Sequence, residues 1–307
     1  MSKCLITYEP NSGDFSLTGL RQLNKKLSKL APLEFTQTEL RTEAMAISDK
    51  ISIQGIQPKL SARLNIKQNQ FDIVDAKGTY IIKVQVPDRP QMPENEDLTM
   101  KMAKIIGIDT PVHGLVRDKE GELNYFIKRF DRHGQKSKYA AEDFAQLTER
   151  TSGTKYDATT ESLIPVIQQY CTFPTIELAK LFKRIFFSFM VGNEDMHLKN
   201  FSLITKNGKT QLSPAYDLIN SSIVLKNSKE ELALPLMGTK SRFKPFHFRD
   251  YLGQEKMLLR PVIVDSIFEE VYNAKVEWHR LVEQSFLSNE MKEKYLALLE
   301  NRFKRMQ

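Results

Sequence analysis

The chain changes character near residue 131, and this change constrains the fold more than any other feature of the sequence. Before it, short runs of β-branched and aromatic residues are typical of strands, interrupted by helical patterns over 16–30 and 94–106. These runs lie at 60–66, 70–75, 79–86, 112–117 and 123–130. After it, helical spacing dominates. One predicted helix follows Pro174, and two more cover 262–283 and 289–304. Short strands are predicted at 201–205 and 209–212. We therefore predict an α+β protein with a mainly β lobe over 1–130 and a mainly α lobe over 131–307.

Composition and charge set the broad class. Of the 307 residues, 41% are hydrophobic and 27% are charged, which excludes a disordered or fibrous protein. The two cysteines, Cys4 and Cys171, argue against a disulfide scaffold. Neither a secretory leader nor a membrane-spanning run is evident, so we predict a cytoplasmic protein with no membrane partner. The net charge of +7 indicates either an anionic partner or a solvated lysine-rich surface.

The segment 193–200 carries the strongest functional pattern. Asp195 and Asn200 are five residues apart, as in the catalytic loop of protein kinases, and Asp217 follows 17 residues later. Phosphoryl transfer needs a carboxylate that orients or deprotonates the acceptor hydroxyl, and oxygen ligands for Mg²⁺. Asp195 suits the first role, and Asn200 and Asp217 suit the second. The alternative is an Asp- and Asn-rich loop whose side chains cap neighbouring backbone groups.

A lysine inside an apolar strand supports the phosphoryl-transfer interpretation. Lys83 lies in the run Tyr-Ile-Ile-Lys-Val, which resembles the kinase strand whose lysine holds the α- and β-phosphates. A charge in a half-buried strand needs a partner. Bound phosphate would serve, and so would a glutamate of the next helix, for which we prefer Glu96 to Glu94. The alternative is an edge-strand lysine that faces water.

The phosphate-covering loop is the weakest part of this pattern. The chain has no G-x-G-x-x-G motif, and the candidate segment, 52–59, contains only Gly55. Pro58 has no N–H to offer, and Lys59 would supply charge instead. On physical grounds alone, a plain turn explains this segment better.

Five motifs, in order along the chain, resemble the HipA family of bacterial serine/threonine-protein kinase toxins from toxin–antitoxin systems. They lie at 52–60, 80–83, 128–132, 195–202 and 212–217. The most diagnostic is Asp-Met-His-Leu-Lys-Asn-Phe-Ser at 195–202. The resemblance implies a two-lobed protein-kinase-like fold and the use of ATP and Mg²⁺.

The resemblance also implies a role for each site residue. Lys83 would hold the ATP phosphates, Asp195 would be the catalytic aspartate, and Asn200 and Asp217 would bind Mg²⁺. His197 would lie in the catalytic loop near the nucleotide.

The remaining nucleotide contacts would come from the first lobe. The strand end 126–130 would be a hinge that offers backbone hydrogen bonds to adenine. Ser52 would be an autophosphorylation site, where the added charge would compete with ATP. The residues implied for the ATP site are Gly55, Lys59, Lys83, Phe126, Lys128, Phe130, Asp131, His197 and Asn200.

Two positions depart from the family pattern. Gln54 stands where some short members carry a second serine, so two-site control would be reduced to Ser52. Met196 stands where many members have glycine, so we expect the loop backbone to avoid a positive φ there. Neither change removes a catalytic atom.

The resemblance finally implies partners and a substrate. The chain resembles the short HipT-type toxin, which lacks an N-terminal subdomain that a small HipS-like protein supplies. A HipB-like DNA-binding protein would be the second partner, so that DNA is contacted only indirectly. The implied substrate is an aminoacyl-tRNA synthetase, such as tryptophanyl- or glutamyl-tRNA synthetase, whose phosphorylation would inhibit translation and growth.

Three points stay open at this level. The chain could be a catalytically weak DNA-associated scaffold of a repressor complex, or a small-molecule kinase of related fold. The leucine stripe between Leu17 and Leu30 could dock a partner or pack within the chain.

Overall fold

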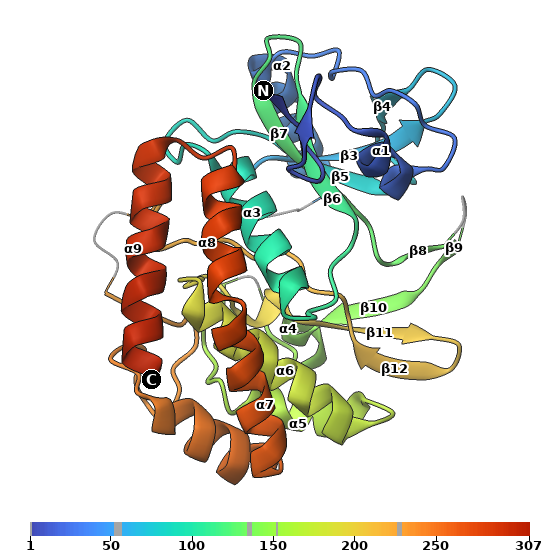
Figure 1. Ribbon diagram of the computed structural model, residues 1–307. Coiled ribbons are helices and arrows are strands. Elements are labelled where there is room, and N and C mark those ends of the chain that lie inside the picture. The colour runs from blue at the N-terminus through green and yellow to red at the C-terminus, as the bar shows by residue number, and fades with distance from the viewer. Residues whose placement is uncertain (1, 52–56, 134–136, 152, 226–228) are drawn as a thin grey trace. The chain divides into compact units, whose positions relative to one another are not determined.

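The computed structural model describes residues 2–51, 57–133, 137–151, 153–225 and 229–307, which divide into two compact units (Figure 1). The first unit comprises Met1–Leu98, Pro111–Ser137 and Gln284–Phe286, and the second comprises Thr99–Thr110, Lys138–Glu283 and Leu287–Gln307. Helix α3 (Met92–Ile105) begins in the first unit and ends in the second.

An antiparallel sheet forms the centre of the first unit, with the strand order β4-β3-β5-β7-β6. Its strands are β3 (Lys59–Asn65), β4 (Gln70–Ile73), β5 (Tyr80–Lys83), β6 (His113–Arg117) and β7 (Leu123–Lys128). Strand β5 is the middle strand, so the alternative of an edge-strand lysine at Lys83 is wrong. Shorter strands are β1 (Ser2–Lys3), which pairs with β2 (Pro10–Asn11), and β8 (Arg132–His133) and β9 (Ser137–Lys138).

The leucine stripe packs within the first unit. Helix α1 (Leu17–Leu23) is shorter than the helix predicted over 16–30, because Asn24 adopts an extended conformation and ends it. The leucines that follow are nevertheless buried in one cluster with the residues of β3 and β5. The members of the stripe in this cluster are Leu20, Leu23, Leu27 and Leu30.

Helix α2 (Gln37–Ile51) occupies a polar stretch for which the sequence analysis predicted no helix. It begins with a capping box: the Thr36 hydroxyl accepts from the Glu39 N–H, and the Glu39 carboxylate accepts from the Thr36 N–H. This T-x-x-E pattern was readable in the sequence. The helix packs against β3 and buries Leu40 and Ala44.

Helices dominate the second unit. They are α4 (Phe144–Leu147), α5 (Leu163–Tyr170), α6 (Pro174–Met190), α7 (Pro261–Asn273), α8 (Lys275–Gln284), α9 (Asn289–Met306), the 3-10 turn η1 (Leu198–Asn200) and the π-helix η2 (His247–Lys256). The predicted helix over 262–283 divides at Ala274, just after Asn273, a poor helix former.

A small antiparallel sheet borders these helices. It consists of β10 (Ala140–Asp143), β11 (Ser202–Lys206) and β12 (Lys209–Leu212), and β12 packs against α5 and α6 (Figure 1). Helix α6 buries the apolar stripe that the sequence predicted, and it also buries two charged residues, Glu177 and Arg184. These two charges matter for the site described below.

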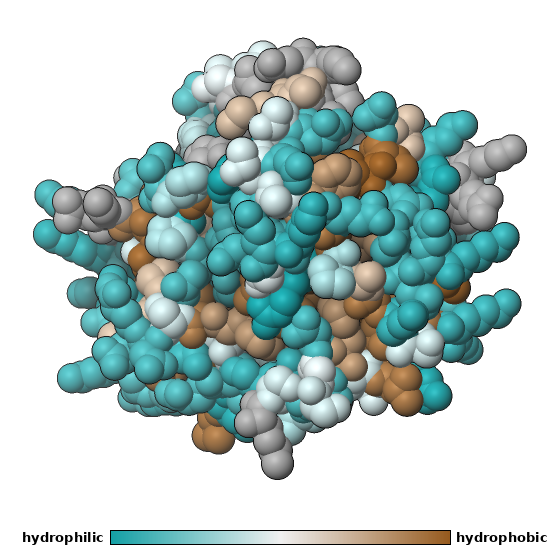
Figure 2. All heavy atoms as spheres, turned by 90° about the horizontal axis from the view of Figure 1, so that it is seen from above, coloured by the Kyte–Doolittle hydropathy of each residue, from teal (hydrophilic) through white to brown (hydrophobic). Residues whose placement is uncertain are grey.

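Hydrophilic residues cover most of the face shown in Figure 2, and hydrophobic residues form small groups between them. Within the described part of the chain, no helix has both the length and the apolar character that a membrane crossing requires.

Candidate functional site

Lys83 forms a buried ion pair with Glu96 in the first unit. The Lys83 Nζ lies 2.6 Å from Glu96 Oε1 and 2.8 Å from Oε2, and the side chains are 5% and 2% exposed. The ammonium also lies 5.6 Å from the centre of the Tyr125 ring. The glutamate preferred from the sequence is therefore the one that pairs with the strand lysine.

Lys59 is the cross-strand partner of Lys83 in the β3–β5 ladder. Partners in an antiparallel ladder project from the same face of the sheet, and like charges in that position repel each other. The register therefore places two of the predicted phosphate-binding lysines side by side.

The first two turns of α3 are held by hydrogen bonds on both sides of Glu96. Both carboxylate oxygens of Glu94 accept from Gln85 Nε2, at 3.0 and 2.9 Å, and His113 Nδ1 lies 2.7 Å from Asp97 Oδ1. Burial raises the pKa of Glu94 to about 7, although the Gln85 hydrogen bond lowers it. These bonds fix the helix start that presents Glu96 to Lys83.

The strand end 126–130, which was predicted to be the hinge, uses its side chains and N–H groups within the chain. Phe126 is fully buried, and its ring centre lies 5.1 Å from that of Phe71. The N–H of Lys128 donates to Val112 at 2.8 Å, and the N–H of Arg129 donates to Thr79 at 2.9 Å. Phe126 thus contributes to the core, and these two N–H groups are already satisfied within the chain.

Asp131 is held by arginines just after the hinge. It accepts from Arg129 at 3.0 and 2.9 Å, and Arg132 lies 3.4 Å away. Burial raises the pKa of Asp131, but the bonds and charge of Arg129 outweigh it and lower that pKa overall. Asp131 is therefore ionised at neutral pH. The predicted Ser52 and Gly55 lie outside the described residues.

In the second unit, the segment that follows α6 is folded by its own polar side chains. The Asn200 Nδ2 donates to the Asp195 carbonyl at 2.8 Å, and the Asp195 N–H donates to Asn193 Oδ1 at 3.2 Å. Because this bond uses the amide nitrogen of Asn200, its amide oxygen is available to a metal ion. Met196 is absent from the residues with positive φ, as expected for a non-glycine residue there.

Gly192 shapes the start of this segment, which we call the catalytic loop (192–200). Its φ is +71°, and a Cβ there would lie 2.7 Å from Leu298, 2.8 Å from Ser222 and 2.9 Å from Asn220. Its carbonyl accepts from the Ser221 and Ser222 hydroxyls. Only glycine meets both requirements, because it tolerates the left-handed region and adds no side chain.

The carboxylate of Asp195 is approached by two side chains. The Tyr156 hydroxyl donates to its Oδ1, and His197 Nε2 lies 3.9 Å from the same oxygen. Burial lowers the pKa of His197, whereas Asp195 and, more weakly, Asp217 raise it. Asp195 and Asp217 therefore both lie close enough to His197 to act on its charge.

Asp217 adopts the left-handed region with a φ of 54°, which is strained for a non-glycine residue. The preceding Tyr216 is half-buried, and its hydroxyl bonds to Ser202 at 2.5 Å and to the Lys199 carbonyl at 2.9 Å. The Ala215 N–H donates to the Asp109 carbonyl at 2.7 Å. The two residues that precede the strained aspartate are thus anchored.

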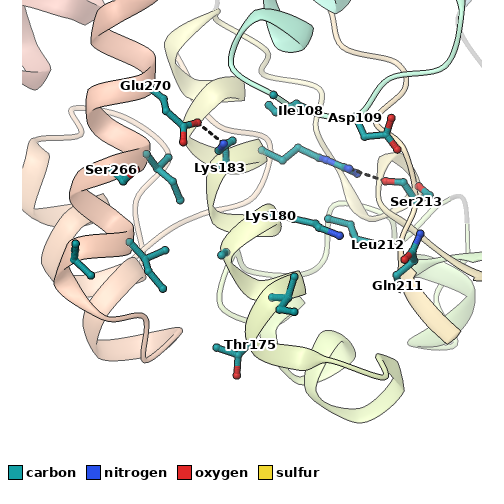
Figure 3. A pocket seen from close by; sticks show the side chains of 17 residues that line it. Ile108, Asp109, Thr175, Lys180, Lys183, Gln211, Leu212, Ser213, Ser266 and Glu270 are labelled. Carbon is teal, nitrogen blue, oxygen red and sulfur yellow. Dashed lines mark hydrogen bonds and ion pairs between the residues drawn. The ribbon is translucent and has the colours of Figure 1, made fainter.

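The two buried charges of α6 hold the end of β12 that leads to Asp217. Arg184 donates to the Ser213 carbonyl at 2.7 Å, and Glu177 accepts from the Leu212 N–H at 2.9 Å. A cavity of about 640 Å³ borders the same segment, between α6 and α7 (Figure 3). None of the predicted site residues lines this cavity.

The oxygen atoms of Asn200 and Asp217 fit Mg²⁺. Carboxylate and amide oxygens are hard donors, and Mg²⁺ usually takes one or two protein ligands together with substrate phosphates and water. Over the described ranges, no cluster of three or more His, Cys, Asp or Glu residues forms a metal site complete in itself. Asn200 and Asp217 would therefore hold the metal together with a phosphate-bearing nucleotide.

The sequence analysis did not find Tyr156, Tyr216 or Arg184. Tyr156 reaches Asp195 from a separate loop, and no local pattern indicates this. Arg184 did leave a signal, because it is a charge on a helix whose neighbours are almost all apolar.

The strand lysine with its helix glutamate, and the later Asp, Asn and Asp residues, follow the order that protein kinases use. They define a protein of the protein-kinase-like class. The chain belongs to the family of HipA-like C-terminal domains, whose model matches residues 51–278. A putative kinase of Haemophilus influenzae is 30% identical over 318 residues, which cover 94% of this chain and 92% of that protein.

Two kinases of known structure share the fold. HipA of Shewanella oneidensis, solved with HipB and operator DNA, has a TM-score of 0.70 at 17% identity, over 91% of this chain and 73% of that one. In sequence, the serine/threonine-protein kinase toxin HipA of that organism is 22% identical over 61% of this chain and 47% of the toxin. The proinflammatory kinase CtkA of Helicobacter pylori has a TM-score of 0.54 at 14% identity, over 74% of this chain and 87% of that one. The family resemblance and the predicted kinase-like fold are confirmed.

Proposed function

We propose that this chain is an ATP- and Mg²⁺-dependent serine/threonine-protein kinase that acts as the toxin of a toxin–antitoxin system. The observation that carries the proposal is the buried pair of Lys83 and Glu96 on the middle strand of the sheet. Protein kinases need this lysine–glutamate pair for transfer.

The residues of the second unit supply the transfer chemistry. Asp195 accepts the proton of the acceptor hydroxyl, whose oxygen then bonds to the γ-phosphorus as the bond to ADP breaks. Lys83 holds the α- and β-phosphates, and Asn200 and Asp217 bind the metal. Mg²⁺, when bound, neutralises the charge on the phosphate oxygens. Each required group is a side chain of this chain, which disfavours the scaffold alternative.

The substrate and partners follow from the family. We propose an aminoacyl-tRNA synthetase as the substrate, tryptophanyl- or glutamyl-tRNA synthetase in the first instance, with inhibition of translation as the result. The HipA structure that matches this chain contains HipB and operator DNA, which supports a HipB-like partner and indirect contact with DNA. A small HipS-like partner, autophosphorylation at Ser52 and a cytoplasmic location remain predictions.

Transfer of labelled phosphate tests the proposal. The purified chain is incubated with Mg²⁺, γ-labelled ATP and each of the two synthetases. We expect label on a serine of one synthetase, and loss of transfer in Asp195→Asn and Asp217→Asn. The matched control is Asp75→Asn, which removes an exposed carboxylate between β4 and β5. Wild-type transfer by either of the first two variants would overturn the mechanism.

A further inference from the structure

We propose that Tyr156 occupies the position of the acceptor hydroxyl at Asp195, so that its loop competes with the protein substrate for the catalytic carboxylate. This inference rests on the proposed function, because it assumes that Asp195 is the residue that receives the acceptor proton. It adds a control of substrate access that the proposed function does not contain.

The contacts of Tyr156 lie on the catalytic loop itself. Its hydroxyl donates to Asp195 Oδ1, and its ring meets the His197 ring edge to face, with 5.0 Å between the centres. The neighbouring Lys155 carbonyl accepts from the Leu198 N–H at 3.3 Å. The loop tip (153–157) is therefore attached to the residues that carry the proposed chemistry.

The chemistry of this bond is that of a bound substrate. A general base must lie within hydrogen-bond reach of the hydroxyl whose proton it removes. Tyrosine and serine both present an O–H donor, and the Tyr156 side chain takes one acceptor position of Asp195 Oδ1 together with the space beside it. Tyr156 thus satisfies Asp195 in the absence of a substrate, and a substrate serine must displace it.

The loop is built so that such displacement costs little. Tyr156 is 38% exposed. Apart from the contacts of Lys155 and Tyr156, the hydrogen bonds of the described tip residues are local, between Thr151, Thr154 and Asp157. The loop is anchored farther on, where Thr160 bonds to the carbonyls of Leu234 and Pro235. The tip can therefore leave Asp195 while its base stays in place.

A positioning role for Tyr156 makes the opposite prediction. If the hydroxyl serves to orient the Asp195 carboxylate for catalysis, its removal lowers kcat. If it occupies the acceptor position, its removal raises turnover, because water and substrate then reach the carboxylate. The sign of the change separates the two roles.

The test uses water as the acceptor, so that no protein substrate has to be known. ADP release is measured at saturating ATP for the wild-type chain, Tyr156→Ala and the matched control Tyr170→Ala, an exposed tyrosine at the end of α5. We expect Tyr156→Ala to raise turnover roughly tenfold, the order expected for loss of one charge-assisted hydrogen bond, with the KM for ATP unchanged. Adding Asp195→Asn to Tyr156→Ala should abolish the gain. Turnover equal to or below that of the wild-type chain would overturn the inference.

The proposed function fails in a different way. It is overturned if Asp195→Asn, made in the wild-type background, leaves turnover and protein phosphorylation unchanged. Hydrogen–deuterium exchange gives a readout that is independent of catalysis. The amides of the loop tip should exchange faster in Tyr156→Phe than in Tyr170→Phe, and equal exchange would show that the Tyr156 hydroxyl does not hold the tip.

Discussion

The ammonium group of Lys83 lies 2.6 Å from a carboxylate oxygen of Glu96, and both side chains are buried. The two residues come from different elements, the middle strand of a sheet and the second turn of a helix. Their pairing therefore shows that β5 and α3 are in contact. In the proposed kinase, the ion pair holds Lys83 in the position in which it binds the ATP phosphates.

Breaking this pair should cost both stability and activity. We expect Lys83→Met to destabilise the chain by about 3–5 kcal/mol, because it removes the cation that pairs with the buried Glu96 carboxylate. The double variant Lys83→Met with Glu96→Leu should regain most of that stability and none of the transfer activity. Urea unfolding and the labelled-phosphate assay measure the two effects, with the exposed Lys67→Met as the control. A stable and active Lys83→Met would contradict the account.

The raised pKa of Glu94 predicts a pH dependence of stability. Between the ordinary pKa of 4.5 and the folded value of about 7, the folded state holds a proton on Glu94 that the unfolded state has lost. Stability from this group is thus complete below pH 4.5 and is lost as the pH rises through 7, by on the order of 3 kcal/mol. Glu94→Gln, a neutral isostere, should remove this part of the pH dependence. Urea unfolding at pH 5 and pH 8 checks this, and an equal slope in both proteins would refute it.

Close packing at Gly192 of the catalytic loop can be tested with Gly208, a glycine outside that loop, as the control. Both have a positive φ, of 71° and 73°, but a Cβ at Gly208 would meet nothing within 4 Å. Gly208→Ala should therefore cost only the backbone strain, about 1 kcal/mol. Gly192→Ala adds the clash with three side chains, so it should cost about 2–3 kcal/mol more and impair transfer. Equal stability losses in the two variants would show that close packing at Gly192 is unimportant.

We predict that the substitution Arg184→Met weakens metal binding and changes the stability of the chain only a little. Burial lowers the pKa of Arg184 to about 10, which still leaves it charged at neutral pH. Its Nε and one terminal nitrogen find no partner among the described residues, so Arg184→Met relieves a buried charge as it removes the bond to Ser213.

Because Ser213 precedes the segment that places Asp217, we expect Arg184→Met to need severalfold more Mg²⁺ for half-maximal transfer. Arg280→Met removes an exposed arginine and is the control. An unchanged Mg²⁺ dependence in Arg184→Met would show that Arg184 of α6 does not influence the metal site.

Much of the fold was predictable because its signals are local. The strands of the first unit and the apolar helix after Pro174 follow from hydrophobic periodicity. The helix over 16–30 was predicted too long, because leucines at helical spacing can also be buried by an irregular segment once Asn24 ends the helix. Helix α2 was missed because its few apolar residues give a weak period, although its capping box is present in the sequence.

The site was predictable where a motif fixes the spacing, as it does for Asp195, Asn200 and Asp217. The contact of Tyr156 with Asp195 joins residues far apart in the chain, and only the folded loop reveals it. The burial of Phe126 is likewise a tertiary property, since it depends on the rings of Phe71 and Tyr80.

The most direct test of the central claim is mass spectrometry of this chain and of total cell protein after brief induction. The account predicts a new phosphoserine on an aminoacyl-tRNA synthetase, together with phosphate on Ser52, and growth arrest in the same cells. Neither modification should appear with Asp195→Asn. Growth arrest without any new phosphoserine, or the same phosphoserines with Asp195→Asn, would contradict it.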